Sequence, residues 1–117
     1  MNSNSSTTSS STTSTTDVSI AGTSVTPGAG DYVVLLSTTF EHTGAIDSDV
    51  TISIYVNGVQ VSDSVRKVSM VLGDIVSISS QAHITVGAGE VIEAFWNTSS
   101  GDQQTMEARS MIVMQVN

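Results

Sequence analysis

The stretch Val50-Thr-Ile-Ser-Ile-Tyr-Val-Asn-Gly-Val-Gln-Val61 decides the fold class of this chain. Its apolar residues alternate with polar ones in steps of two as far as Val56, which is the pattern of a β-strand with one buried face. Asn57-Gly58 tolerates the positive φ angles that a type I′ turn requires, and the alternation resumes at Val59. The stretch therefore predicts a β-hairpin.

Similar patterns mark further strands on both sides of this hairpin. The predicted strands are Asp31–Phe40, Arg66–Leu72, Ile75–Val86, Glu90–Trp96 and Thr105–Val116. The chain has 16 valines and 9 isoleucines but only 3 leucines, and β-branched residues favour pleated strands over helices. About seven or eight short strands, with turns roughly every ten residues, predict an all-β, antiparallel β-sandwich with jelly-roll topology.

Composition divides the chain into two parts. Asn2 to Thr16 contains only Ser, Thr and Asn, and a tract without apolar side chains cannot bury enough surface to offset its ordering entropy. We therefore predict an extended N-terminal arm over residues 1–17 that neighbouring molecules hold in place. A flexible linker or stalk is the alternative. Residues 18–117 suffice for one jelly-roll domain with a single core.

Charge and cysteine content narrow the classes of partner. The formal net charge is −8 with 3 basic residues, so the chain would repel phosphate backbones and we predict no nucleic-acid binding. Neither a basic amphipathic helix nor a long apolar run supports a membrane role, and the N-terminus lacks the pattern of a signal peptide. Without cysteine there are no disulfides or thiolate metal sites. A small domain without such staples is expected to gain burial by association.

Patterns for catalysis or cofactor binding are missing from the sequence. His42 and His83 are its 2 histidines, and no Gly-x-Ser-x-Gly elbow accompanies them. Glycine pairs such as Gly87-Ala-Gly89 precede strands, not helices, so they do not cradle phosphate. Asp47-Ser-Asp49 offers carboxylates to Ca²⁺ but lacks the spacing of a calcium loop. We predict no enzyme, cofactor or metal site, with calcium at these aspartates as the minor alternative.

Two late strands carry apolar residues on both faces. Alternation places Phe95 opposite to Trp96 within one strand, and Met111 and Val113 opposite to the other apolar residues of the last strand. A half-exposed sheet needs only one apolar face, so we predict that a symmetry mate covers the second. Local curling of the sandwich edge is the alternative. The predicted subunit interface comprises Phe95, Met111 and Val113, with Glu93 and Arg109 paired between the two strands if these are neighbours.

Several segments also carry a family resemblance. Besides the hairpin, these are Gly30-Asp31-Tyr32 before an apolar strand, Ile84-Thr-Val-Gly-Ala-Gly-Glu-Val-Ile92, and Ser110-Met-Ile-Val-Met-Gln-Val116. Over residues 30–117 the chain resembles the trimeric jelly rolls typified by tumour necrosis factor and the globular heads of complement collagen-like proteins. It is shorter and less aromatic than most eukaryotic members, and its Ser/Thr arm is more similar to versions on bacteriophage heads and tails. The resemblance implies a homotrimer whose closing strand runs near the three-fold axis.

We therefore predict a bacteriophage structural protein, a homotrimeric decoration or cement protein on the capsid surface of the virion. It would stabilise the shell by contact. Its arm would hydrogen-bond the major capsid protein or neighbouring subunits through Ser5, Thr8, Ser11, Thr13 and Thr16.

The alternative is a receptor- or carbohydrate-binding tip of a phage fibre or tail. Trp96, Tyr55 and the loop Asn97–Asp102 would then form the contact surface, because exposed aromatic rings stack on sugars. Core packing is the competing interpretation for Trp96.

Overall fold

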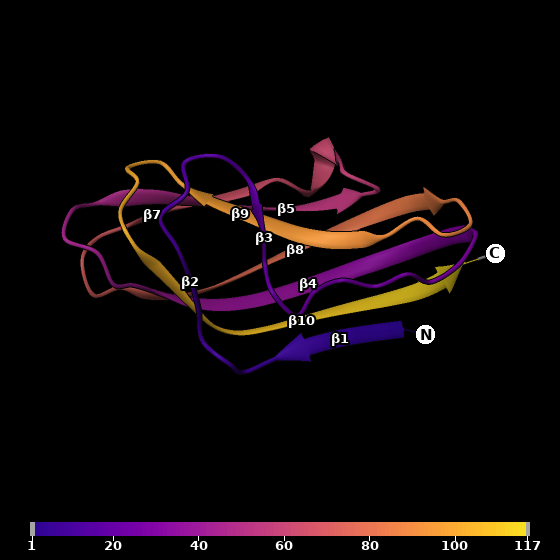
Figure 1. Cartoon of the computed structure of the whole chain (residues 1–117), viewed down its shortest axis with the longest axis horizontal. Coiled ribbons are helices and arrows are strands. Elements are labelled where there is room, and N and C mark those ends of the chain that lie inside the picture. The colour runs from indigo at the N-terminus through magenta and orange to yellow at the C-terminus, as the bar shows by residue number, and fades with distance from the viewer. Residues whose placement is uncertain (1, 117) are drawn as a thin grey trace.

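Two antiparallel β-sheets pack face to face in residues 2–116, the part of the chain that this computed structural model describes (Figure 1). Sheet A consists of β1 (Asn2–Ser6), β2 (Ser10–Thr12), β4 (Gly30–His42), β8 (Ile75–Val86) and β10 (Gln104–Val116). Sheet B consists of β3 (Val18–Ser19), β5 (Ser48–Val56), β6 (Val59–Gln60), β7 (Arg66–Met70) and β9 (Ile92–Thr98). The 3₁₀ turn η1 (Ser62–Ser64) joins β6 to β7. Within the same residues, no helix is long and apolar enough to cross a bilayer.

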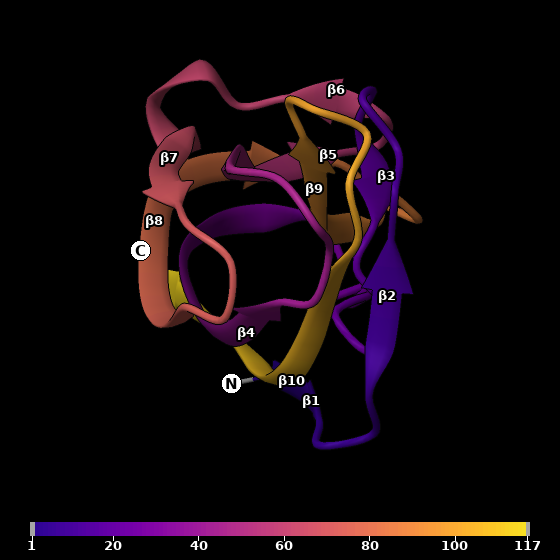
Figure 2. The same cartoon turned by 90° about the vertical axis from the view of Figure 1, so that its left-hand side faces the viewer.

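The strands of each sheet come from distant parts of the sequence. The order in sheet A is β1-β10-β4-β8, with β2 beside the start of β10. In sheet B it is β3-β9-β5-β6, with β7 also paired to β5. The end-on view separates the layer of β4 and β10 from the layer of β5 and β9 (Figure 2). These features confirm the predicted antiparallel sandwich with jelly-roll topology.

The predicted hairpin is present between β5 and β6. Val56 pairs with Val59, and the turn residues Asn57 and Gly58 have φ angles of 50° and 80°. Both values lie in the left-handed region that a type I′ turn uses. The turn thus fixes where β5 ends and which of its residues face the core.

The core lies between the sheets and takes alternate residues of the long strands. Trp96 of β9 meets Phe40 of β4 edge to face, with ring centroids 6.2 Å apart and planes at 70°. The largest fully buried apolar side chains are Trp96, Phe40, Leu36, Ile52, Ile54, Met70, Ile92, Met106 and Met111. Each such burial contributes about 1.5–3 kcal/mol.

A β-bulge in β10 changes which of its residues face the core. Strict alternation would place Met106 and Met111 on opposite faces, because they are an odd number of positions apart. Instead the register with β4 shifts between Met106 and Ala108, and both methionines are 0% exposed. The residue inserted at the bulge restores the inward orientation for Met111 and Val113.

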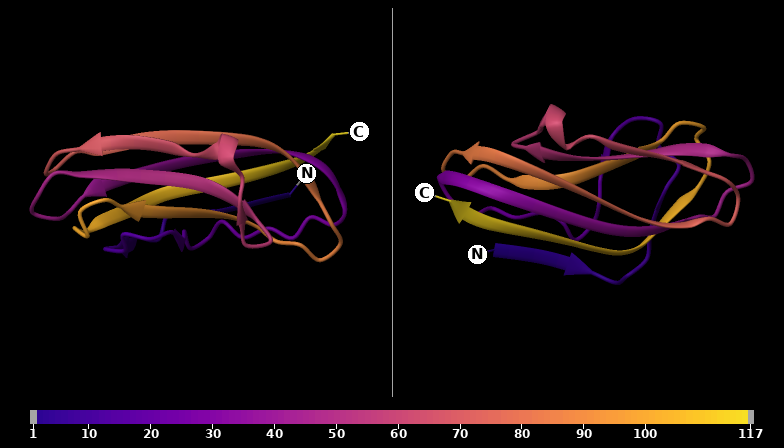
Figure 3. Two further views of the ribbon diagram at one scale, coloured as in Figure 1. Left: turned by 90° about the horizontal axis from the view of Figure 1, so that it is seen from above. Right: turned by 180° about the vertical axis from the view of Figure 1, so that it is seen from behind.

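The N-terminal segment is part of sheet A and does not protrude from the domain. β1 pairs antiparallel with β10 from Asn2↔Val113 to Ser6↔Arg109, and β2 pairs with the start of β10. Figures 1 and 3 show β1 along the edge of the sheet, beside the end of β10. The prediction that other molecules hold residues 2–16 needs this correction, since the chain's own β10 holds β1 and β2. Main-chain pairing to a long strand orders a polar segment without burying its side chains.

Candidate functional site

The residues predicted for a subunit interface do not share one surface. Met111 and Val113 are 0% exposed and belong to the core of the single chain. Phe95 and Glu93 lie half-buried on the outer face of sheet B. Arg109 lies on β10 of sheet A. β9 and β10 are therefore not neighbours, and the predicted pairing of Glu93 with Arg109, which depended on their adjacency, does not form.

Arg109 instead fastens the N-terminal segment from inside. Its side chain is 5% exposed, and Nε donates to the Ala21 carbonyl at 2.6 Å while Nη1 donates to the Thr8 carbonyl. Burial lowers the pKa of the Arg109 guanidinium. A buried cation needs hydrogen-bond acceptors. Here the acceptors are the Thr8 carbonyl, which precedes β2, and the Ala21 carbonyl, which follows β3.

The residues predicted to contact a shell face their own chain or solvent. They are Ser5, Thr8, Ser11, Thr13 and Thr16. Ser5 lies opposite Ser110 in the β1–β10 ladder, and the Ser11 hydroxyl is 2.9 Å from that of Thr105. Thr13 and Thr16 are exposed after β2. The Thr16 N–H and carbonyl are hydrogen-bonded to the Ser14 hydroxyl. Of the five, Ser5, Thr8, Ser11 and Thr16 therefore have partners within the domain.

Two aromatic rings pack together on the outer face of sheet B. The ring centroids of Tyr55 and Phe95 are 4.0 Å apart and their planes are tilted by 36°. Phe95 pairs with Ser53 across β5 and β9, and Tyr55 pairs with Glu93, so the rings meet along the diagonal between two rungs. Both side chains are half-buried, which leaves part of the ring pair open to solvent.

One carboxylate holds the polar groups around these rings. Asp17, just before β3, accepts a hydrogen bond from the Tyr55 hydroxyl. Its Oδ2 also accepts from Gln60 Nε2 at 3.3 Å, and its Oδ1 accepts from Asn97 Nδ2 at 2.6 Å. The hydrogen bond to Asp17, with burial and the charge of Asp17, raises the pKa of Tyr55 to about 12. Because β5, β6 and β9 each hold a member, and Asp17 lies next to β3, the sheet fixes the arrangement.

We call these five residues the aromatic face: Asp17, Tyr55, Gln60, Phe95 and Asn97. Beneath them, Ser53 is 0% exposed and its hydroxyl accepts from Gln60 Nε2 at 3.2 Å. The aromatic face therefore combines an apolar ring pair with two amides and a carboxylate. That combination can stack on an apolar ligand surface and exchange hydrogen bonds with hydroxyl groups around it.

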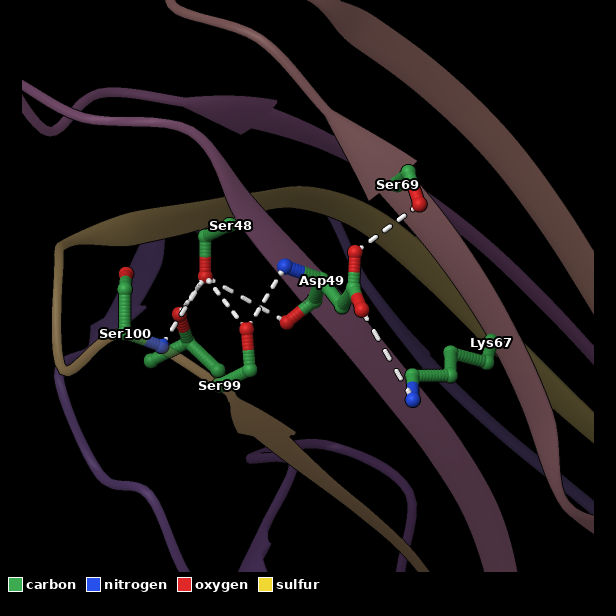
Figure 4. A network of polar contacts seen from close by, with 7 residues as sticks. Ser48, Asp49, Lys67, Ser69, Ser99 and Ser100 are labelled. Carbon is green, nitrogen blue, oxygen red and sulfur yellow. Dashed lines mark hydrogen bonds and ion pairs between the residues drawn. The ribbon is translucent and has the colours of Figure 1, made fainter.

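A second polar network lies at the start of β5 (Figure 4). The Ser48 hydroxyl accepts from the Ser100 main-chain N–H at 3.3 Å, and the Ser99 hydroxyl accepts from the Asp49 N–H at 2.9 Å. The Asp49 carboxylate accepts from the Ser69 hydroxyl at 2.8 Å and lies 3.6 Å from Lys67 Nζ. Among residues 2–116, no three His, Cys, Asp or Glu residues are grouped to hold a metal ion. The network joins strands within the chain.

The residues of the predicted sugar-contact loop separate in the structure. Trp96 is 2% exposed and lies in the core, as the competing interpretation expected. Asn97 belongs to the aromatic face. Asp102 binds the β4–β5 loop, where its Oδ2 accepts from the Ile46 N–H at 2.6 Å and also from the Ala45 N–H. These main-chain donors lower the pKa of Asp102, and the loop is thereby held against the sandwich.

Sequence reasoning missed the roles of Asp17 and Gln60 and assigned Phe95 to a different surface. A usable signal exists, because Tyr55 and Phe95 both occupy the polar-facing positions of alternating strands. Aromatic residues there are uncommon in this chain, which has 1 tryptophan, 2 tyrosines and 2 phenylalanines. Their contact, however, depends on the register of β5 against β9, which alternation alone does not give.

No known family profile matches this sequence, and no curated protein sequence matches it either. Solved structures are similar to it in fold to different degrees. The C-terminal domain of EclA, described as a sugar-binding protein, superposes with a TM-score of 0.54 at 11% identity, covering 92% of this chain and 79% of that one. Eiger TNF from S. frugiperda reaches 0.45 at 10% identity, covering 77% and 61% of the two chains. CBM35 from Cellvibrio japonicus Abf62 reaches 0.45 at 10% identity, covering 77% and 64%. At 11% identity, the EclA domain shares the sandwich architecture with this chain, and the likeness shows nothing finer.

Proposed function

We propose that this protein is a carbohydrate-binding domain and that the aromatic face is its binding site. The observation that carries the proposal is the Tyr55–Phe95 ring pair on the outer face of sheet B, with Asp17 holding polar groups around it. The function is binding without turnover.

The chemistry of the aromatic face fits a sugar ring. The C–H groups of a pyranose pack on aromatic carbon, while its hydroxyls exchange hydrogen bonds with neighbouring polar groups. Gln60 and Asn97 present amides, and Asp17 presents a carboxylate, beside the rings. Since Asp17 already orients these side chains, binding costs little additional side-chain ordering.

The negative charge of the chain disfavours anionic glycans. The chain has a formal net charge of −8, and Asp17 and Glu93 lie at or next to the ring pair. Carboxylated, sulfated or phosphorylated sugars would meet like charge there. The expected ligands are therefore neutral oligosaccharides.

The fold is compatible with this function without proving it. The EclA domain, a sugar-binding protein, uses the same sandwich architecture. A fold hosts many functions, so the argument rests on the residues of the aromatic face and not on the similarity.

An array of immobilised oligosaccharides, followed by calorimetric titration of each hit, tests the proposal. We expect neutral glycans among the hits, and we expect Phe95→Ala to weaken binding at least about tenfold, or 1.4 kcal/mol. Leu35→Ala is the matched control, because Leu35 is a 37% exposed apolar side chain on the other sheet. Absence of any binding, or equal losses in both variants, would contradict the proposal.

The capsid-decoration prediction loses two of its arguments. It relied on a polar arm free to bind other molecules and on Met111 and Val113 as interface residues. β1 and β2 pair with β10 of the same chain, and both residues lie in the core. A place on a virion, as decoration or as a fibre tip, stays a prediction.

A further inference from the structure

The four lateral edges of the sandwich are protected to very different degrees. At three of them the outermost strands are short: β1 has 5 residues, β7 has 5, and β3 and β6 have 2 each. β7 also carries Arg66 and Lys67. The fourth edge is β8, which has 12 residues without proline or formal charge and runs in unbroken register along β4. Long, uncharged edges are what proteins normally avoid exposing, because they pair with other strands.

The hydrogen-bonding pattern between β4 and β8 identifies the residues of β8 whose main-chain N–H and C=O groups face the open edge. In its register with β4, the His42 N–H donates to the Asp74 carbonyl at 2.9 Å, which marks a hydrogen-bonded pair just before β8 begins. Such pairs alternate along an antiparallel ladder. The even-numbered residues of β8 therefore bond to β4, and the odd-numbered ones point N–H and C=O at the open edge. Those residues, all exposed, are Ile75, Ser77, Ser79, Gln81, His83 and Thr85.

The open edge is also accessible at its centre. A hollow of about 340 Å³ runs beside Gln81–His83, with Asp63 and Arg66 on its other wall. η1 approaches β8 from the inner side, where the Ser80 hydroxyl donates to the Ser64 carbonyl. An added strand in the plane of sheet A thus finds free main-chain groups along β8.

We propose that β8 pairs with β8 of a second copy of this chain, antiparallel, about a two-fold axis at Ser80. Residues directly opposite each other in an antiparallel pair point to the same face of the sheet, and side chains alternate along each strand. The core-facing residues of the two copies therefore lie on the same face only if the axis passes through a residue position. With the axis at Ser80, every edge-facing residue finds an edge-facing partner, and Ser79 lies opposite Gln81 of the partner subunit. An axis at Gln81 would leave Ile75 unpaired. The axis at Ser80 therefore satisfies the most main-chain groups.

Symmetry favours a second copy as the occupant, and charge limits where two copies can meet. Two chains with a net charge of −8 each repel one another over most of their surface. β8 has no Asp, Glu, Lys or Arg, so contact there brings no like charges opposite each other on the paired strands. Five of its six edge-facing residues are polar, and a two-fold axis at Ser80 pairs each of the six with another, as an isologous contact requires.

The proposed dimer has a consequence for binding that rests on the carbohydrate function. Because the axis is perpendicular to sheet A, both copies keep their aromatic faces on the same side of the dimer. Two sites facing one glycan-bearing surface bind with an avidity that exceeds single-site affinity, by about 10²–10⁴-fold where the spacing matches. The dimer itself does not depend on that function.

Light scattering after size exclusion, without glycan and at about 100 μM chain, tests the pairing. The chain has a mass of 12.1 kDa, so we expect about 24 kDa for the wild type, from the two copies of the proposed symmetry. The double variant S79K/Q81K sets an ammonium group opposite an ammonium group across the axis, and we expect it to return to 12.1 kDa. The variant S79E/Q81K changes the same two positions but sets the introduced carboxylate of each copy opposite the introduced ammonium group of the other, so it keeps the dimer. S3K/S5K, on the opposite edge of sheet A, is the matched surface control and also stays dimeric.

Three results would overturn the proposal. They are a wild-type mass of one chain, a wild-type mass of three chains, and a dimer that S79K/Q81K leaves intact. Circular dichroism melting of each variant shows whether it is folded, and the wild-type mass decides the question even if S79K/Q81K fails to fold. Since no glycan is present, a failure of carbohydrate binding leaves this test unaffected.

Discussion

The outer faces of the two sheets follow the same alternation but present different chemistry. Across sheet A one rung is entirely serine, Ser5–Ser110–Ser37–Ser79 from β1 to β8. Across sheet B the corresponding positions hold Tyr55 and Phe95, stacked and surrounded by the partners of Asp17. Alternation requires only that an outward position tolerate water. The difference teaches that alternation alone does not call for bulky rings at such positions, and our proposal assigns these two to ligand binding.

The largest expected effect separates the two sides of β9. Trp96 is 2% exposed in the core, whereas its neighbour Phe95 is half-buried on the aromatic face. We expect Trp96→Ala to lower the free energy of unfolding by about 3–5 kcal/mol, through lost burial and a cavity. Phe95→Ala should cost about 0.5–1.5 kcal/mol through loss of the ring pair. Urea unfolding of both variants measures the contrast, and equal losses would show that Phe95 is a core residue after all.

A smaller effect tests how the edge of sheet A is closed. Arg109→Ala removes the donors to the Ala21 and Thr8 carbonyls, and we expect a loss of about 2–3 kcal/mol in unfolding free energy. Hydrogen exchange of β1 should accelerate in the variant. Arg66→Ala is the control, because Arg66 donates only to nearby carbonyls at the exposed end of η1. If β1 exchanges at the same rate in Arg109→Ala, the guanidinium does not hold the segment.

Some features of the fold could be predicted from the sequence and others could not. The hairpin at Asn57-Gly58 and the sandwich follow from alternation and turn chemistry, which are local. The position of the N-terminal segment does not, because β1 is ordered by main-chain pairing to β10, a partner at the far end of the chain. The orientation of Met111 could not be predicted from alternation either, because the extra residue at the bulge reverses the facing of every later residue in β10.

The candidate site fails to emerge from sequence for a similar reason. Tyr55 and Phe95 touch only because β5 and β9 pair with Ser53 opposite Phe95. Asp17 reaches Tyr55 from 38 positions away, through the placement of β3 beside β9. Neither contact produces a periodic pattern in the sequence from which it could be predicted.

The hydrogen bond between Tyr55 and Asp17 predicts a pH dependence at the aromatic face. The pKa of Tyr55 is raised to about 12 in the fold, against about 10 for an unperturbed tyrosine. The folded state therefore retains a proton that the unfolded state has lost between these values. The associated stability is complete below about pH 10 and disappears as the pH rises toward 12.

Absorbance of tyrosinate against pH measures this shift. Asp17→Asn should return the titration of Tyr55 toward about 10, and Tyr55→Phe should remove one of the 2 tyrosine titrations. The unfolding midpoint of Tyr55→Phe should also fall less steeply than that of the wild type as the pH rises from about 10 toward 12. Unchanged titration in Asp17→Asn would show that the carboxylate does not hold the ring.

The most direct test of the carbohydrate-binding account is an NMR titration of the ¹⁵N-labelled protein with the best neutral oligosaccharide from the array. The account predicts saturable shifts at Tyr55, Phe95 and Asn97, together with protection of the Gln60 side-chain amide. Residues of the serine rung on sheet A, such as Ser37 and Ser110, should not respond. Shifts confined to sheet A, or none at a glycan concentration that saturates the array, would contradict the assignment of the aromatic face.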